Sequence, residues 1–351
     1  MTVEDIELSP PRAGEVRVRM VASGVCHSCQ HVVDGSFPGV TMPVILGDEG
    51  AGVVEEVGAD VTRVVAGDHV IISWAPTCGH CRYCVRGRPV LCENPIPFGF
   101  LRDGSVRFHL DGSDVHHFGP ATYASEVILP EDMTVPIRKD MPLEQAALIG
   151  CSVTTGVGAV TNAAQVPAGA SLVVIGCGGI GLNAIQGGRL VSAEPIIAVD
   201  LDPIKLEAAR VMGATHTIDA RDADVPEAIR ELTGGRGAEY AVIAVGNGKA
   251  VEQAWASLAK GGTAVLLGLL PPGEKLTIDP IRLMGHECRL IGTSYGSSRP
   301  SDDFGRLVDL YLSGKLLIDE LISHRYQLEQ VNEAHQALVD GGTLRGRLVY
   351  D

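Results

Sequence analysis

Hydrophobic and polar positions alternate along the N-terminal third of the chain. GEVRVRMVASG alternates between two glycines, and the apolar runs VILGDEGAGVVEEVG and GDHVIISW follow it. A period of two is typical of β-strands, and glycines between such runs suit bulges and tight bends. The pattern therefore predicts a β-rich domain at the start of the chain.

From residue 141 the hydrophobic period changes. PLEQAALIGCSVTTGVGAVTNAAQ has helical spacing, with Pro142 near its N-terminus. Strand and helix candidates then alternate, from SLVVIGCGGIGLNAIQGGRL through PIIAVD, PIKLEAARVMG, THTID, VPEAIRELTG, YAVIAV, KAVEQAWASLAKGG and TAVLLGLL to CRLIGTSYG. This alternation predicts βαβ units in a doubly wound parallel sheet. Two more helix candidates, DDFGRLVDLYLSG and LEQVNEAHQALVDGG, precede a final strand, RGRLVYD.

These patterns predict two domains in an α/β protein. We expect the β-rich domain to comprise residues 1–152 and 293–351, with the doubly wound domain inserted at residues 153–292. A length of 351 residues also favours two domains over one core.

Composition excludes some classes of partner. The net charge of −15 argues against nucleic acid and anionic membrane surfaces as partners. We find no apolar run of bilayer length and no signal pattern at the N-terminus, and we expect a cytoplasmic protein.

Four of the nine cysteines lie within fifteen residues, as Cys78, Cys81, Cys84 and Cys92. In a reducing compartment this spacing favours a metal over disulfides, and four thiolates complete a tetrahedral structural zinc site. The alternative is four unrelated buried cysteines.

A glycine turn follows the strand SLVVI. It contains Gly176, Gly178, Gly179, Ile180 and Gly181, and Asp200 ends the next strand. Backbone amides at the start of a helix face a pyrophosphate in dinucleotide-binding proteins, and an acid at the second strand binds the ribose hydroxyls. The acid repels a 2′-phosphate, so the turn predicts NAD rather than NADP, with Thr155 and Lys205 as further candidate contacts. The alternative is a tight βα turn without a ligand.

The stretch from Gly24 to Gly52 combines soft and hard metal ligands in a glycine-rich segment. Its candidate side chains are Cys26, His27, Ser28, Cys29, His31, Asp48 and Glu49. Cys151 lies at the boundary of the two predicted domains and is a candidate for a further ligand; the alternative is a small core residue.

Together these residues resemble the zinc-dependent alcohol dehydrogenases of the medium-chain dehydrogenase family. The resemblance covers essentially the whole chain and rests on GVCHS, GDEGAGVVEEVG, PTCGHCRYCVRGRPVLC, DGSVRFHLDGSDVHHF, LIGCSVTTGVGAV and IGCGGIG…AVD. It implies a GroES-like catalytic domain, a Rossmann domain that binds NAD, and a homodimer.

The resemblance also implies roles for individual residues. Cys26 and Cys151 match thiolate ligands of a catalytic zinc, Ser28 and His31 match a proton relay, and Glu49 matches an acidic residue beside the metal. Other residues match contacts to the cofactor pyrophosphate (His27, Arg345) and a wall of the substrate pocket (Trp74).

Three departures from the family pattern stand out. Asp48 replaces a histidine ligand, and Cys29 replaces the aspartate that orients that histidine. We expect Asp48 to be the third zinc ligand; a shell that uses Cys29 or Glu49, or the loss of catalytic zinc, are the alternatives. The chain also begins at MTVEDIEL, without the family's opening strand, which would leave a sheet edge unpaired.

The predicted function is that of an NAD-dependent alcohol dehydrogenase, interconverting an alcohol and an aldehyde or ketone. The alcohol would bind zinc at its open position and lose its proton through Ser28, the nicotinamide ribose and His31, while hydride passes to NAD. Two alternatives remain open at this point. One is a zinc-independent reductase of an activated C=C or C=N bond, and the other is a non-catalytic NAD-binding protein.

Overall fold

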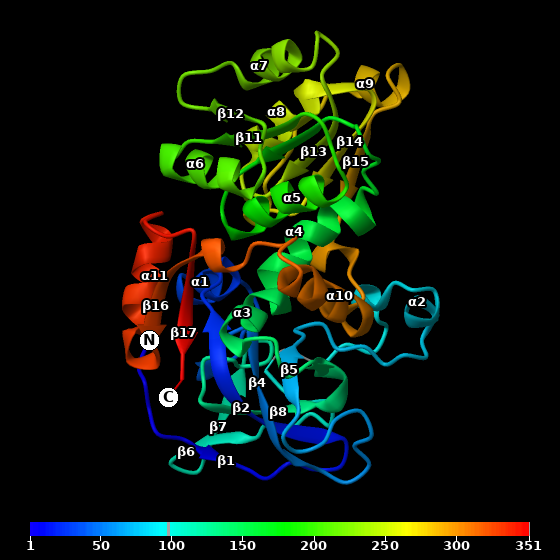
Figure 1. Cartoon of the computed structure of the whole chain (residues 1–351). Helices are drawn as coiled ribbons and strands as arrows, with labels where there is room; N and C mark the ends of the chain where they lie inside the picture. The colour runs from blue at the N-terminus through cyan, green and yellow to red at the C-terminus, as the bar shows by residue number, and fades with distance from the viewer. Residues whose placement is uncertain (97–98, 351) are drawn as a thin grey trace. The chain divides into compact units, whose positions relative to one another are not determined.

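The chain forms two compact units in a computed structural model that describes residues 1–96 and 99–350 (Figure 1). Unit 1 comprises Met1–Cys151 and Arg299–Asp351, and unit 2 comprises Ser152–Ser298.

Unit 1 is built around one long strand, β2 (Glu15–Gly24), which pairs with three other strands. Val16, Val18 and Met20 are buried, while Arg17 and Arg19 on the opposite face form ion pairs with acidic side chains. The alternation seen in the sequence therefore separates a core face from a charged face. The seven-stranded sheet contains β16 (Ile322–Gln327), β17 (Arg345–Val349), β2, β4 (Gly50–Val57), β5 (His69–Ile72) and β9 (Thr134–Ile137) in that order, with β8 (Glu126–Pro130) also on β2.

A second, four-stranded sheet completes the β-structure of unit 1. Its order is β1 (Glu7–Leu8), β6 (Phe108–Leu110), β7 (Ser113–His117) and β3 (Val44–Ile45). The N-terminal segment thus does contribute a short strand, antiparallel to β6, which the sequence did not predict. The helices of unit 1 are α1 (His27–Val33), α2 (Arg82–Val85), α3 (Leu143–Leu148), α10 (Pro300–Leu312) and α11 (Val331–Val339).

Unit 2 contains a parallel six-stranded sheet. The strand order is β12 (His216–Asp219), β11 (Ile196–Asp200), β10 (Leu172–Ile175), β13 (Ala238–Ile243), β14 (Leu258–Leu266) and β15 (Arg289–Gly292). Alternate residues of the central strands pack on different helices, so the sheet is covered on both faces. The helices are α4 (Thr154–Gly158), α5 (Gly179–Leu190), α6 (Pro203–Met212), α7 (Val225–Leu232), α8 (Gly248–Ser257) and α9 (Pro280–Met284).

Two details differ from the sequence prediction. The pattern predicts that LAKGG ends a helix. In the structure α8 stops at Ser257, and LAKGG is the start of β14. The expectation that the chain holds no apolar run of bilayer length was also wrong. The helical stretch Leu143–Ala163 is long and apolar enough to cross a membrane, by length and composition. Within its 18-residue apolar window, 83% is buried inside the protein, which is the property of a core helix.

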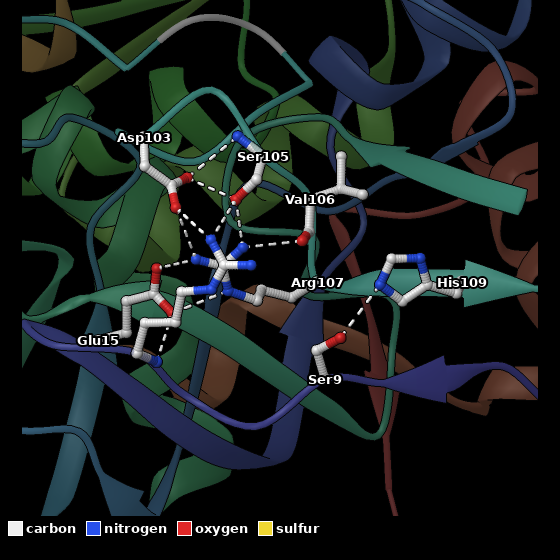
Figure 2. A network of polar contacts seen from close by, with 8 residues as sticks. Ser9, Glu15, Asp103, Ser105, Val106, Arg107 and His109 are labelled. Atoms are coloured by element: carbon white, nitrogen blue, oxygen red, sulfur yellow. Dashed lines mark hydrogen bonds and ion pairs between the residues drawn. The ribbon is translucent and has the colours of Figure 1, made fainter. Parts of the chain in front are cut away.

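Arg107 is a buried charge that ties the start of β2 to the loop before β6 (Figure 2). Its guanidinium donates to both carboxylate oxygens of Glu15, with Nε to Oε2 at 2.9 Å, and to Asp103 at 3.1 Å. Glu15 also accepts from the backbone N–H of Arg12 at 2.9 Å. Bidentate pairing of this kind satisfies a charge that burial would otherwise make costly.

We expect Arg107→Ala to lower the free energy of unfolding by about 3–5 kcal/mol, because the Glu15 carboxylate then stays buried without its partner. Arg12→Ala is the matched control: Arg12 pairs with the same Asp103 from an exposed position, so its loss should cost less than about 1 kcal/mol. Denaturant unfolding measures both. Similar losses in the two variants would show that the buried pair contributes no more than the exposed one, against this expectation.

Candidate functional site

Among the described residues, Cys26, Asp48 and Cys151 bring three potential metal ligands together in unit 1. The two sulfur atoms and a carboxylate oxygen all lie within 4.8 Å of one another, and all three side chains are buried. Cys26 is the N-cap of α1, and Asp48 lies in the turn between β3 and β4. Cys151 lies in a π-helical segment, η3 (Ile149–Val153). Interruptions of this kind in a helix are frequent at functional sites.

The turn that carries Asp48 is fixed by its backbone. Gly47 has φ of +111°, and a Cβ there would lie 2.5 Å from the Thr122 hydroxyl oxygen. The Glu49 carbonyl accepts hydrogen bonds from the hydroxyls of Ser23 at 2.7 Å and Thr122 at 3.1 Å. Only glycine suits Gly47, and the two hydroxyls hold the residue that follows Asp48.

The electrostatics of the three groups suit a divalent cation. The Cys151 thiol hydrogen-bonds to Cys26, and this, with the charge of Arg345, holds the pKa of Cys26 well below its usual range. Burial, together with the charge of Cys26, raises the pKa of Asp48. Two thiolates and a carboxylate are an acceptable ligand set for zinc, and the ion would relieve their mutual repulsion. The residues therefore fit a zinc ion.

Cys29 and Glu49, the alternative ligands, are not part of this group. Cys29 is fully buried, and its Sγ lies 3.8 Å from Oδ1 of Asp48. Glu49 is fully buried and forms an ion pair with Arg345, which is 5% exposed. The Nε atom of Arg345 is buried without a hydrogen-bond partner in the described part of the chain.

The other predicted site residues of unit 1 differ in solvent exposure. Ser28 is partly exposed, with its Oγ 3.6 Å from Sγ of Cys26. His31 is also partly exposed, and its Nδ1 lies 2.8 Å from the Ser36 hydroxyl. His27 is exposed at the first position of α1, and Trp74 is half-buried just after β5.

The four cysteines of the second group also converge. The sulfur atoms of Cys78, Cys81, Cys84 and Cys92 lie within 4.8 Å of one another, and all four side chains are half-buried. Backbone N–H groups point at the sulfur atoms, including those of Cys81 to Cys78 at 3.3 Å and of Asn94 to Cys92 at 3.4 Å. These donors stabilise thiolates, which are the form that binds zinc.

In unit 2 the glycine turn connects β10 to α5. A Cβ on Gly181 would lie 1.7 Å from the Gly176 carbonyl oxygen, so the turn can close only with glycine at that position. Gly178 is the N-cap of α5, and no atom lies within 4 Å of the position that its Cβ would take. The first turn of α5 therefore presents backbone N–H groups beside open space.

Asp200 is held rigidly at the end of β11. Its carboxylate accepts from the backbone N–H groups of Cys177 at 2.6 Å, Leu201 at 2.8 Å and Asp202 at 3.0 Å. Lys205 lies in α6, partly exposed, and Thr155 is buried in α4. Of these three side chains, Asp200 is the one that accepts a hydrogen bond from the glycine turn, among the described residues.

Several residues around Asp48 carry no functional signal in the sequence. Thr122 and Ser23 fix the turn, Tyr123 packs beside Cys29, and the sequence marks His335 only as a surface or core residue. They are distant from Asp48 in sequence and have no motif of their own, so only the fold could reveal them.

Comparison with known proteins identifies the family of the chain. The family profile of the alcohol dehydrogenase GroES-like domain matches residues 12–139, and that of the zinc-binding dehydrogenases matches residues 179–313. The chain is 42% identical to a putative alcohol dehydrogenase D of Mycobacterium tuberculosis, over 99% of this chain and 95% of the relative. The chain belongs to the zinc-dependent medium-chain alcohol dehydrogenase family.

Two further proteins support the assignment. An NDMA-dependent alcohol dehydrogenase of Amycolatopsis methanolica is 41% identical over 99% of this chain and 95% of its own length. The crystal structure of benzyl alcohol dehydrogenase from Acinetobacter calcoaceticus superposes with a TM-score of 0.94 at 31% identity, covering 100% of this chain and 96% of that one. The predicted α/β fold with a GroES-like domain, the alcohol dehydrogenase activity, and zinc and NAD as cofactors are confirmed at the level of the family.

Two zinc ions per chain are expected in the purified protein, because two separate groups of ligands converge in unit 1. Cys84→Ser should leave one zinc per chain, since it removes a thiolate from the four-cysteine group. Cys288→Ser, at a buried cysteine outside both groups, should keep two. Elemental measurement by mass spectrometry gives the ratio, and an unchanged zinc content in Cys84→Ser would exclude the four-cysteine site.

Proposed function

We propose that the chain is an NAD-dependent alcohol dehydrogenase whose catalytic zinc is held by Cys26, Asp48 and Cys151. The observation that carries the proposal is the convergence of these three buried donors within 4.8 Å of one another. Three protein ligands leave a fourth position for substrate, which is the arrangement of catalytic zinc sites. The four-cysteine group, by contrast, is complete and suits a structural zinc.

When bound, zinc supplies a Lewis acid that makes an alcohol hydroxyl easier to deprotonate. Asp48 weakens this effect. Two thiolates and a carboxylate carry one negative charge more than the ion neutralises, whereas a neutral histidine in place of Asp48 would give a neutral site. The more negative shell is a weaker Lewis acid.

Ser28 and His31 are proposed to carry the substrate proton, with the nicotinamide ribose between them. The Ser28 hydroxyl lies beside Cys26 at 3.6 Å and can accept a proton at Oγ as it donates its own. His31 is partly exposed, and its Nδ1 is 2.8 Å from the Ser36 hydroxyl. That contact orients the imidazole, so that Nε2 is the atom that exchanges a proton with solvent.

NAD is the cofactor that the glycine turn supports. Backbone N–H groups at the start of α5 suit the pyrophosphate, and the fixed Asp200 carboxylate suits a ribose diol while repelling a 2′-phosphate. Lys205 and Thr155 are proposed as further contacts to NAD. Arg345 in unit 1 has a buried Nε without a hydrogen-bond partner among the described residues, which supports a contact to the cofactor pyrophosphate, as we also propose for His27. Trp74 is proposed as a wall of the substrate pocket.

We also propose a cytoplasmic homodimer. The reduced four-cysteine group suits a reducing compartment. The strand β15 is at the edge of the unit 2 sheet, and α9 just before it exposes Ile281, Leu283 and Met284. An unpaired edge with apolar neighbours is a common site of association. A sedimentation mass equal to that of one chain would exclude the dimer.

The ligand role of Asp48 predicts the behaviour of two variants. Asp48→Ala should lose one of the two zinc ions and lower kcat/KM for alcohol oxidation about tenfold or more, because two thiolates alone bind the ion poorly. Asp48→His should oxidise alcohols faster, because its neutral shell leaves zinc a stronger Lewis acid. Zinc content and NADH formation with a panel of alcohols measure these effects.

Two outcomes would decide against this function. Full activity in protein from which all catalytic zinc has been removed would exclude the mechanism. No gain in the rate of alcohol oxidation for Asp48→His would count against Asp48 as a ligand.

The glycine turn gives a separate prediction for NAD. Gly178→Ala should fold normally, since φ of −75° suits alanine and nothing lies within 4 Å of its Cβ. It should nevertheless raise the Kd for NAD about tenfold or more, a loss of about 1.4 kcal/mol, because the methyl group occupies the space proposed for the pyrophosphate. Gly181→Ala should instead lower the melting temperature. Titration calorimetry measures the affinity and scanning calorimetry the melting temperature, and unchanged NAD affinity in Gly178→Ala would contradict the proposed site.

A further inference from the structure

Three polar side chains from distant parts of the sequence meet on the four-stranded sheet of unit 1. The hydroxyl oxygen of Ser9 lies 3.1 Å from Nε2 of His109, a contact drawn in Figure 2. Nδ1 of His109 lies 3.2 Å from Oδ1 of Asp114. A serine, a histidine and a carboxylate joined in this order are the arrangement of a nucleophilic hydroxyl with its general base. None of the three residues belongs to the groups proposed to bind zinc, NAD or the alcohol.

The pairing of β6 with β7 sets the histidine beside the carboxylate. His109 is the direct partner of Asp114 in a register that also pairs Phe108 with Val115. Phe108 and Val115 are buried in the core of unit 1. Since successive side chains of a strand point to opposite faces, His109 and Asp114 lie together on the outer face of the sheet.

The pairing of β1 with β6 brings the serine to the same face. Leu8 pairs with Phe108 and packs against the same core. The backbone N–H of Ser9 donates to the Arg107 carbonyl at 2.8 Å, which continues the pairing beyond the end of β1. Ser9 therefore follows an inward-facing residue and contacts His109 on the outer face.

The donors and acceptors of the three side chains are consistent with one tautomer of the imidazole. A carboxylate can only accept hydrogen bonds, so the contact with Asp114 assigns the ring proton of His109 to Nδ1. Nε2 is then free of a proton and accepts from the Ser9 hydroxyl. In this tautomer Nε2 can take the hydroxyl proton when Oγ attacks an electrophile.

None of the three side chains is fully buried. The side chain of His109 is 27% exposed and that of Asp114 is 64% exposed, while Ser9 is half-buried. The hydroxyl and the imidazole are therefore open to a small molecule from solvent.

The backbone around Ser9 restricts the substrates that could react. Backbone N–H groups commonly stabilise the oxyanion of acyl transfer, and the loss of one such donor slows the reaction about 10²–10³-fold. The N–H of Ser9 is already bonded to the Arg107 carbonyl, and the next two residues, Pro10 and Pro11, have no N–H. Because these residues supply no oxyanion donor, the ester must have a good leaving group.

We propose that Ser9, His109 and Asp114 form a second reactive site, which hydrolyses activated aryl esters independently of zinc and NAD. Oγ of Ser9 attacks the carbonyl carbon, and the hydroxyl proton passes to Nε2 of His109. The bond from the carbonyl carbon to the phenol oxygen then breaks, and the phenol leaves with that proton. Water attacks the acyl group on Ser9 and gives a proton to His109, which returns it to Oγ as the acid departs.

Hydrolysis of p-nitrophenyl acetate by the zinc-loaded protein tests the proposal. Wild type should carry an acetyl group on Ser9 after a rapid acid quench, which mass spectrometry of its peptides detects. Ser9→Ala and His109→Gln should lower the protein-dependent release of p-nitrophenol about tenfold or more, because general base catalysis typically contributes about 10²–10⁴-fold. Circular dichroism checks the fold of each variant.

Ser113→Ala is the matched control. Ser113 is an exposed serine next to Asp114 on β7, but it lies opposite Leu110 rather than His109. This variant should keep the wild-type rate and the acetyl group on Ser9.

Two variants of Asp114 test its role as a positioning residue. Asp114→Glu keeps a carboxylate that can accept from Nδ1 of His109, so it should keep most of the rate. Asp114→Asn should be about tenfold slower or more, because an amide can donate to Nδ1 and favour the wrong tautomer.

The results that would overturn the proposal are specific to this site. Wild type without an acetyl group on Ser9, or an unchanged rate of p-nitrophenol release in Ser9→Ala, overturns it. Equal rates in Asp114→Asn and Asp114→Glu overturn the role of Asp114 alone. If His109→Gln fails to fold, Ser9→Ala decides the question, because it removes only a hydroxyl.

Discussion

The concentration of buried negative charge around Asp48 is the constraint on which the rest of the site depends. Cys26, Asp48, Cys151 and Glu49 are all buried, and Arg345 is the cation paired within this cluster. Burying so many acidic groups is costly unless a cation offsets them. The ion pair between Arg345 and Glu49 offsets part of the charge, and a divalent metal would offset most of the remainder.

The fold of unit 1 satisfies this constraint by bringing four distant segments to one place. The end of β2 leads into α1 with Cys26 and Cys29, the turn before β4 supplies Asp48, a π-helical interruption supplies Cys151, and β17 supplies Arg345. The pairing of β2 with both β4 and β17 sets these positions. The same strand anchors Arg107 through Glu15 at its other end, so a second buried charge is also compensated on β2.

The sequence was sufficient for features that depend on local pattern. Alternation predicted β2, the βαβ series predicted the parallel sheet, and spacing predicted that Cys78 and its three neighbours converge. Contacts between residues that are distant in sequence could not be predicted from local pattern. The hydrogen bond between Tyr123 and His335 comes from long-range packing, and β14 begins inside an apparent helix because strand pairing overrides local propensity there. The two replacements at Asp48 and Cys29 were visible in the sequence, but their contact was not.

The central claim is that Asp48 is a zinc ligand in a shell with two thiolates. Anomalous diffraction at the zinc edge from crystals of the protein tests it most directly. We predict a peak bonded to Sγ of Cys26, Sγ of Cys151 and a carboxylate oxygen of Asp48, at about 2.3 Å from each sulfur and about 2.0–2.2 Å from the oxygen. A zinc ion bonded to Cys29 in place of Asp48, or the absence of a peak among these residues while the four-cysteine group holds zinc, would contradict the claim.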